Sequence, residues 1–268
     1  MATRGVGLLA LTSSPERLGA LRARGIVPLL GDLDDAASLR RLAGLATRVL
    51  VLAPPPSQGE GDPRTVALLR SLARGVRPLS LVYGSTTGVY GDCGGALIDE
   101  SRRPRPATPR GRRRVAAERA VRDWGQGGTP VSILRIPGIY APDREGGTPR
   151  ARLERGTPVL RPQDDVFTSH VHADDLARAC LAALWRGRPQ RVYHASDDTR
   201  LKMGDYFDLA ARLYGLPLPP RVDRATAAAM LSPMQMSFLS ESRQLDNRRL
   251  KTELRLVLRY PTVEQGLA

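Results

Sequence analysis

Lysine, aromatic residues and cysteine are all scarce in this chain of 268 residues. Only Lys202 and Lys251 are lysines, so arginine supplies nearly all of the positive charge, and the formal net charge is +14. This skew is typical of coding bias and favours a diffuse basic surface over a nucleic-acid-binding face, although basic surface also attracts phosphorylated ligands. Aromatic residues make up 4% and apolar residues 41%, which predicts a packed core of Leu, Val, Ile and Ala.

The chain also lacks the marks of a disulfide framework, a membrane span or a metal site. Cys93 and Cys180 are far apart, and Cys180 lies on an apolar helical pattern, so we expect a core residue and a reducing, cytoplasmic compartment. No apolar run reaches the roughly 18 residues of a span. His170 and His172 lie two residues apart on an extended segment, and no carboxylate cluster completes a ligand set, so no metal is expected.

What the sequence does contain is a regular alternation of apolar runs and helical patterns. Strands are predicted at 6–11, 26–30, 49–53, 79–84, 131–136 and 191–195, and helices at 14–25, after 32–35, and at 63–74, 117–124, 176–185 and 203–214. This alternation predicts an α/β protein whose doubly wound parallel sheet is covered on both faces. Pro28 predicts an edge strand. We expect a core over residues 1–142 and, over 143–268, a segment that returns to the sheet and forms a small lobe.

Five segments in order resemble one known family. They are Gly31-Asp32-Leu33, Ser85 to Asp92, Arg135 to Pro142, His172 to Ala177, and Asp246 to Leu250 with Tyr260-Pro261. Together they resemble the extended short-chain dehydrogenases, and most of all the atypical NAD-dependent epimerase/dehydratase-like proteins of the nucleotide-sugar epimerase branch. Over almost the whole chain, the resemblance implies a Rossmann-type fold, NADP or NAD as cofactor, and oxidoreductase or epimerase activity. The implied substrate is a nucleotide sugar or related carbonyl compound, and a homodimer is one expectation.

The resemblance implies cofactor contacts at the ends of successive strands. It places Asp32 and Leu33 against the adenine, although Asp32 is equally consistent with a turn or cap residue. After the first visible strand no acidic residue is available for a ribose 2′-hydroxyl, which favours NADP over NAD, with Arg17 able to reach a 2′-phosphate. The resemblance also implies that the backbone at Pro137-Gly138 closely approaches the nicotinamide ribose. An ordinary turn would have the same two residues, so the sequence does not separate the two interpretations. The remaining implied contacts are Thr12, Ser13, Ala53, Pro54, Ser85 and Tyr140.

The catalytic residues depart from the family pattern. Relatives carry a Tyr and a Lys four residues later, and Arg110 and Arg114 stand in those places here. Arg cannot serve as an acid near neutral pH, although Arg114 could hold a ribose or phosphate. Thr86 matches the family's Ser/Thr, and Tyr90 or Tyr140 is either a replacement acid or a packing residue. The alternatives are therefore an active enzyme, a non-catalytic sensor or scaffold, and a remnant that binds nothing.

Two further features of the sequence leave alternatives open. Seven arginines between 102 and 114 form either a solvated face or a clamp for phosphate. Gly5-Val6-Gly7 matches a dinucleotide fingerprint, but only four residues precede it and a strand pattern follows, so we interpret it as a decoy. The chain then starts at the family's second strand, without the central first strand, its glycine loop and its helix. We favour a start codon placed too far downstream, or a shortened polypeptide, over a rearranged fold or a remnant.

Overall fold

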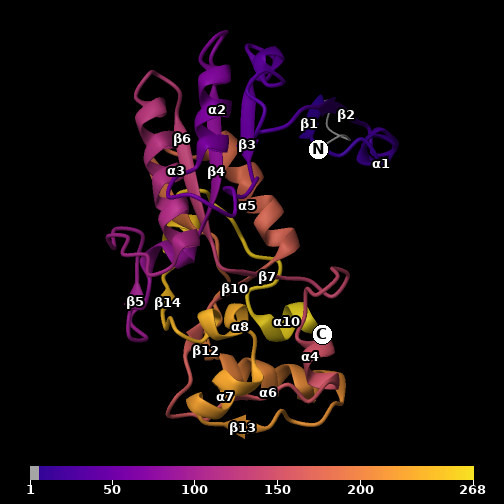
Figure 1. Cartoon of the computed structure of the whole chain (residues 1–268), viewed down its shortest axis with the longest axis vertical. Coiled ribbons are helices and arrows are strands. Elements are labelled where there is room, and N and C mark those ends of the chain that lie inside the picture. The colour runs from indigo at the N-terminus through magenta and orange to yellow at the C-terminus, as the bar shows by residue number, and fades with distance from the viewer. Residues whose placement is uncertain (1–5) are drawn as a thin grey trace.

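A four-stranded parallel sheet forms the centre of the molecule (Figure 1). The structure, a computed structural model, describes residues 6–268. The spatial order of the strands is β11-β6-β4-β3, and all three pairings are parallel. The two central strands are buried along most of their length, because their apolar runs suit a sheet covered on both faces. The bounds are β3 Arg48–Val51, β4 Ser80–Thr86, β6 Val131–Ile136 and β11 Arg191–His194.

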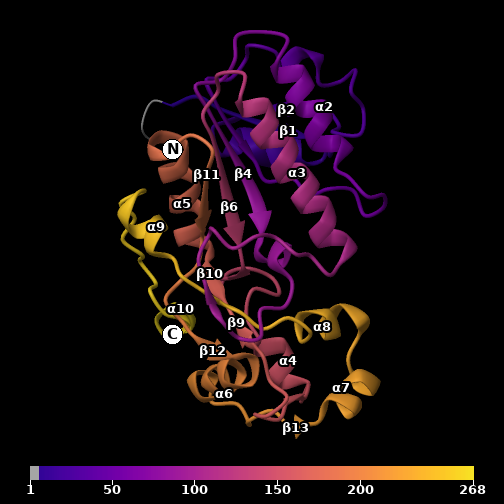
Figure 2. The same ribbon diagram turned by 90° about the vertical axis from the view of Figure 1, so that its left-hand side faces the viewer.

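Helices cover both faces of this sheet (Figure 2). On one face α2 (Pro63–Leu72) and α3 (Pro109–Gly125) pack their apolar side chains against β4 and β6. On the other face α5 (Ala173–Arg186) buries Cys180 together with alanine and leucine side chains. Both α2 and α3 begin with Pro after a capping residue, Asp62 and Thr108, which accept from the backbone N–H groups of Thr65 and Gly111. The doubly wound arrangement and the core position of Cys180 are confirmed.

A second, two-stranded parallel sheet lies beside β3 without pairing with it. It consists of β1 (Leu8–Thr12) and β2 (Ile26–Leu30), joined by α1 (Arg17–Ala23). The strand directly after Gly7 is confirmed, and Gly5 lies outside the described residues. Pro28 lies on β2, which pairs with β1 alone, so the predicted edge position is also confirmed.

The helix predicted after Asp35 is the one clear error in the secondary structure. Only a short 3₁₀ turn, η2 (Arg40–Leu42), forms there. Side chains take the backbone groups that a helix would use: Asp32 Oδ1 accepts from the Asp34 N–H at 2.9 Å, and Asp35 Oδ1 accepts from the Ala37 N–H at 2.9 Å. The Ser38 hydroxyl accepts from the Asp32 N–H. Such local side-chain bonds compete with helix formation.

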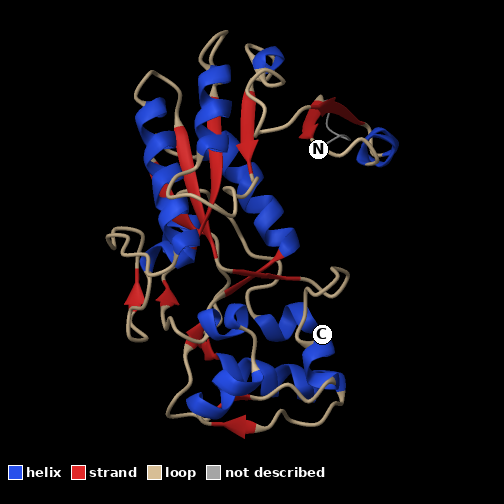
Figure 3. Cartoon of the chain, viewed as in Figure 1, coloured by secondary structure: helices blue, strands red, loops and turns tan. Residues whose placement is uncertain are grey.

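The second half of the chain, after β6, both returns to the sheet and builds a lobe at its carboxyl end (Figure 3). Helix α6 (Met203–Tyr214) is the centre of the lobe and buries Phe207 and Ala210. Its other helices are α4 (Arg150–Glu154), α7 (Arg224–Met230), α8 (Pro233–Phe238) and α10 (Val263–Leu267), and α9 (Arg248–Thr252) lies near β11. Short strand pairs complete it, namely β5 (Leu97–Ile98) with β14 (Gln244–Leu245), β7 (Gly138–Tyr140) with β10 (His170–His172), β8 (Val159–Leu160) with β13 (Arg221–Val222), and β9 (Phe167–Thr168) with β12 (Leu201–Lys202).

Residues 6–268 contain neither a membrane-spanning helix nor a metal-binding cluster. Within this range, no helix combines the length and the apolar character needed to cross a bilayer. The same residues contain no group of three or more His, Cys, Asp or Glu side chains that could hold a metal ion.

Candidate functional site

The carboxyl ends of β3, β4 and β6 bring several predicted site residues together. Thr86 ends β4 and pairs in register with Ile136 of β6, so Pro137 and Gly138 follow at the same edge of the sheet. Arg114 reaches this edge from α3: its Nη1 donates to the Gly84 carbonyl at 2.8 Å and lies 3.5 Å from the carbonyl of Ala53, just beyond β3. In open parallel sheets this is the edge where ligands collect.

Arg114 carries an unused donor at this edge. Its Nη1 also donates to the Tyr83 hydroxyl at 2.9 Å, whereas its buried Nε has no hydrogen-bond partner among the described residues. Arg110, one turn earlier on α3, is exposed, and Arg113 donates to the carbonyl of Gly59. The guanidinium of Arg114 is therefore a buried positive charge held against backbone carbonyls at the ends of β3 and β4.

A buried ion pair lies behind the strand ends. Glu118 of α3 and Arg135 of β6 form a two-pronged contact, with Arg135 Nε 3.0 Å from Oε1 and Nη2 2.7 Å from Oε2. The Ser85 hydroxyl donates to the same Oε1 at 2.6 Å. Because all three side chains are buried, this pairing fixes the end of β4 against α3 and leaves little room for a different arrangement.

The hydroxyl of Tyr90 forms hydrogen bonds with two side chains inside the protein, Arg135 and His194. It accepts from Arg135 Nη1 at 2.7 Å and lies 2.5 Å from His194 Nε2. Burial lowers the pKa of His194 to about 4, so the ring is neutral. Its Nδ1 lies 2.9 Å from the Asp246 carbonyl and must donate to it, which leaves Nε2 to accept the Tyr90 proton. Burial also raises the pKa of Tyr90 to about 12, so a catalytic Tyr90 would first have to release both partners.

Tyr140 lies in a packed aromatic cluster on β7. Its hydroxyl donates to the Thr262 carbonyl at 3.2 Å, and its ring meets that of His172 edge-on with centroids 5.3 Å apart. Burial raises the pKa of Tyr140 and lowers that of His170 to about 4. His172 Nδ1 accepts from the Asp174 N–H and caps α5. These contacts give the cluster a packing and capping role.

The residues predicted to contact the adenosine half of the cofactor lie at the ends of β1 and β2. Thr12 Oγ1 accepts from the Ser14 N–H, and Ser13 and Arg17 are exposed. Asp32 is exposed and closes a turn, which agrees with the turn interpretation, while Leu33 packs against the core. Pro54 is exposed beyond β3. The β1–β2 sheet and the four-stranded sheet are not hydrogen-bonded to each other. The predicted residues therefore form two groups, one at the ends of β1 and β2 and one at the ends of β3, β4 and β6.

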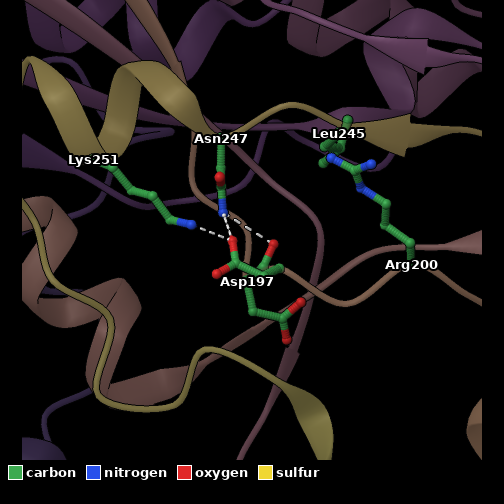
Figure 4. A pocket seen from close by; sticks show the side chains of 6 residues that line it. Asp197, Arg200, Leu245, Asn247 and Lys251 are labelled. Carbon is green, nitrogen blue, oxygen red and sulfur yellow. Dashed lines mark hydrogen bonds and ion pairs between the residues drawn. The ribbon is translucent and has the colours of Figure 1, made fainter.

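A polar pocket of about 460 Å³ lies beyond the end of β11 (Figure 4). Asn247 Nδ2 donates to the Asp197 carbonyl at 3.1 Å and to Asp198 Oδ1 at 2.8 Å, and Lys251 binds the same Oδ1. Arg200 lines the opposite side. Asp197 is 4% exposed with Oδ2 unpartnered among the described residues, and burial raises its pKa to about 8. At neutral pH this carboxyl is therefore mostly protonated.

Three of these buried polar residues are not predicted as site residues from the sequence, namely Arg135, Glu118 and Asp197. Arg135 is a charge inside an otherwise apolar strand, and that anomaly is a signal that the sequence alone could have provided. Glu118 lies on the polar pattern of a helix and gives no such signal. Asp197 follows a strand end, where only its burial distinguishes it from an ordinary turn residue.

Comparisons with known proteins agree with this geometry. The family model described as "NAD dependent epimerase/dehydratase family" matches residues 64–195. A functionally unknown conserved protein from Silicibacter pomeroyi is 35% identical, with a TM-score of 0.83, and the match covers 99% of this chain and 90% of that one. A search of curated proteins finds no match.

Two solved enzymes are similar in fold alone. UDP-glucose 4-epimerase from Thermotoga maritima, solved with UDP-glucose, is 18% identical, with a TM-score of 0.78 and coverage of 99% of this chain and 89% of that one. A double mutant of dTDP-glucose 4,6-dehydratase from Streptomyces venezuelae, solved with NAD bound, is 20% identical, with a TM-score of 0.75 and coverage of 97% and 86%. The Rossmann-type α/β fold predicted from the sequence is confirmed.

Proposed function

This chain belongs to the NAD dependent epimerase/dehydratase family, and we propose that it is an NAD(P)-binding oxidoreductase or epimerase acting on a nucleotide sugar or a related carbonyl compound. The observation that carries the proposal is the meeting of Thr86, Arg114 and the Ala53 carbonyl at one edge of the parallel sheet. Ligands of open α/β sheets bind at that edge. Within the proposal, residues 1–142 hold the cofactor and the lobe formed from 143–268 covers the substrate.

The nicotinamide half of the cofactor is proposed to lie over the ends of β4 and β6. Arg114 would hold the ribose or a phosphate oxygen at this edge, and Pro137-Gly138 would let the backbone approach closely. At the other half, Thr12, Ser13 and Arg17 would hold the adenosine ribose. NAD-binding sites use a carboxylate at this position to bind the ribose 2′-hydroxyl, and Thr12-Ser13 offers none. Arg17 offers instead a cation for a 2′-phosphate, which favours NADP.

The bound cofactor would accept or return the hydride, and the residues of this chain would orient the reacting oxygen. Thr86 Oγ1 accepts from the Gly88 N–H at 3.3 Å, and its proton has no acceptor among the described residues, so it can donate to a substrate oxygen. Arg114 adds fixed positive charge without giving up a proton. The Glu118–Arg135 pair holds the Thr86 strand end in place through Ser85.

A non-catalytic nucleotide sensor is the second candidate function. One observation favours it: Arg110 and Arg114 replace the Tyr and Lys that relatives use, and both Tyr90 and Tyr140 are buried with engaged hydroxyls. A sensor would bind the same cofactor with the same residues and would turn nothing over.

Thermal melting and turnover together separate these candidates. Millimolar NADPH or NADH should raise the melting temperature, since a ligand that binds only the folded state stabilises it. Hydride transfer with a panel of nucleotide sugars should fall about 10²-fold in Thr86→Ala, the usual loss for one positioned donor. Thr47→Ala, exposed at the opposite end of β3, is the matched control and should change neither result. A nucleotide shift without turnover would favour the sensor, and no shift with either nucleotide would contradict both.

A further inference from the structure

Arg114 is a buried cation without a counter-ion. It is 7% exposed, and its guanidinium contacts backbone carbonyls and the Tyr83 hydroxyl. No Asp or Glu among the described residues forms an ion pair with it, whereas the buried Arg135 is paired with Glu118 at 2.7 Å. Burying a positive charge is costly unless a negative charge lies beside it. The ligand-binding edge of the sheet therefore carries an uncompensated positive charge.

The first turn of α3 brings a second arginine to this edge. α3 lies alongside β4 and runs in the opposite direction (Figure 2), because Trp124 near its end packs against Arg77, before β4, whereas Gly111 packs against Gly88, beyond β4. A Cβ on Gly111 would lie 2.9 Å from the Gly88 carbonyl oxygen, so a side chain there would push the helix away. Arg110, the residue before Gly111, therefore lies beyond the end of β4.

Arg110 and Arg114 lie on one face of α3. Residues four apart are neighbours on the surface of a helix, and their side chains tilt toward its N-terminus, which here points to the carboxyl end of the sheet. Arg110 is exposed and forms neither a hydrogen bond nor an ion pair with the part of the chain that the structure describes. Arg112 differs, because it pairs with Glu60 at 3.6 Å. Two cations without a carboxylate partner thus lie one turn apart near Thr86.

We propose that the substrate carries a carboxylate close to the carbon that exchanges hydride, and that Arg110 binds this carboxylate. The proposal rests on the proposed function, in which Thr86 marks the position of the reacting oxygen. The planar fork of an arginine can bind both oxygens of a carboxylate at once. The substrate class is therefore a sugar acid or a related hydroxy or keto acid, either free or linked to a nucleotide.

The position of Arg110 favours a carboxylate over the phosphates of the ligands. A nicotinamide ribose at Arg114 is neutral and leaves the charge of Arg114 unbalanced. Even a phosphate oxygen at Arg114 leaves Arg110 free, one turn nearer the carboxyl end of the sheet, where the lobe lies (Figure 2). In a nucleotide sugar the diphosphate is joined to the anomeric carbon, so the ring separates it from the other ring carbons. A negative charge near Thr86 therefore belongs to the reacting part of the substrate.

Arg110 acts in this proposal as a specificity-determining residue. An arginine keeps its proton near neutral pH, so Arg110 binds and orients the substrate and does not serve as the acid. Because its side chain is exposed, its replacement should leave the folded structure intact. Arg119 is an exposed arginine farther along the same helix and provides a matched control.

Titrations with UDP-glucuronate and UDP-glucose test the proposal, because the two compounds differ only in a carboxylate and a hydroxymethyl group at C6. The native chain, with or without NADPH, should bind the acid about tenfold more tightly, as expected for one charged hydrogen bond. Arg110→Gln should remove this preference, Arg110→Lys should keep part of it, and Arg119→Gln should leave it unchanged. Free glucuronate, titrated in the same way, distinguishes a free acid from a nucleotide-linked one.

Equal affinity for the acid and the neutral sugar, or a preference that survives in Arg110→Gln, would overturn the proposal. So would the failure of all three compounds to bind in both conditions. The ligand-free melting temperature of Arg110→Gln, which should match that of the native chain, guards the result against misfolding. Turnover with equal kcat/KM for the two nucleotide sugars would overturn this proposal and leave the proposed function intact. A preference dependent on Arg110, without turnover or cofactor binding, would retain the carboxylate site and contradict the proposed enzyme.

Discussion

The two parallel sheets contain similar sequences and have very different surroundings. β4 and β6 are apolar strands with a neighbour on each side and helices on both faces, and nearly every residue in them is buried. β1 and β2 are also apolar, but no residue in either strand is buried. The difference teaches that an apolar run specifies a strand, whereas burial depends on which neighbours the topology supplies. Substitutions in the two regions should therefore have unequal effects.

The largest loss of stability is expected from breaking the buried pair behind β4. Glu118→Ala should lower the free energy of unfolding by about 3–5 kcal/mol, because it leaves Arg135 as an uncompensated buried charge. Denaturant unfolding measures this loss. Glu118→Gln keeps the shape and part of the hydrogen bonding and should cost less. A loss below about 1 kcal/mol in Glu118→Ala would mean that water reaches the pair.

Truncating one leucine in each sheet compares the two regions directly. Leu134→Ala in β6, at 0% exposure, should cost about 2–5 kcal/mol because a cavity forms in a closed core. Leu9→Ala in β1, at 41% exposure, should cost less than about 1 kcal/mol in the 268-residue chain. Equal losses at the two positions would show that β1 is covered as completely as β6.

An effect of comparable size, but dependent on pH, is expected at Asp197. Because burial raises its pKa to about 8 in the folded protein, the folded state binds a proton that the unfolded state releases near pH 4. The resulting stability is fully present below pH 4 and is lost progressively as pH rises from about 4 to 8, by on the order of 1 kcal/mol per pH unit. Asp197→Asn should remove this slope between pH 5 and 8 in melts recorded across that range. Parallel curves for the two proteins would contradict the raised pKa.

The smallest effect is expected at the ion pair that ties β2 to α2. Asp34 is half exposed, so Asp34→Ala should leave the melting temperature almost unchanged, and added salt should remove any difference. A clear drop at high salt would indicate that the β1–β2 pair depends on this contact for its position.

Much of the fold follows from the sequence alone, and the failures have local physical causes. The runs at β2, β6 and α6 predict those elements to the residue, because apolar periodicity dominates there. The helix expected after Asp35 fails because aspartate and serine side chains capture the backbone donors. At the site, the family resemblance points to Thr86 and Arg114, and the structure brings the end of β4 and the Arg114 side chain of α3 to one edge of the sheet. The Glu118–Arg135 pair is not predictable in the same way, because residues 17 apart meet only once α3 crosses β6.

The most direct test of the proposed cofactor site is a fluorescence titration of NADPH, repeated with NADH, against matched arginine variants on α3. Arg114→Met removes the buried guanidinium at the strand ends, and Arg119→Met removes an exposed one from the same helix. We predict saturable binding in the native chain, weakened about tenfold or more in Arg114→Met and unchanged in Arg119→Met, as expected for loss of one charged hydrogen bond. Equal binding by all three proteins would place the nucleotide elsewhere, and no binding to the native chain would contradict the account.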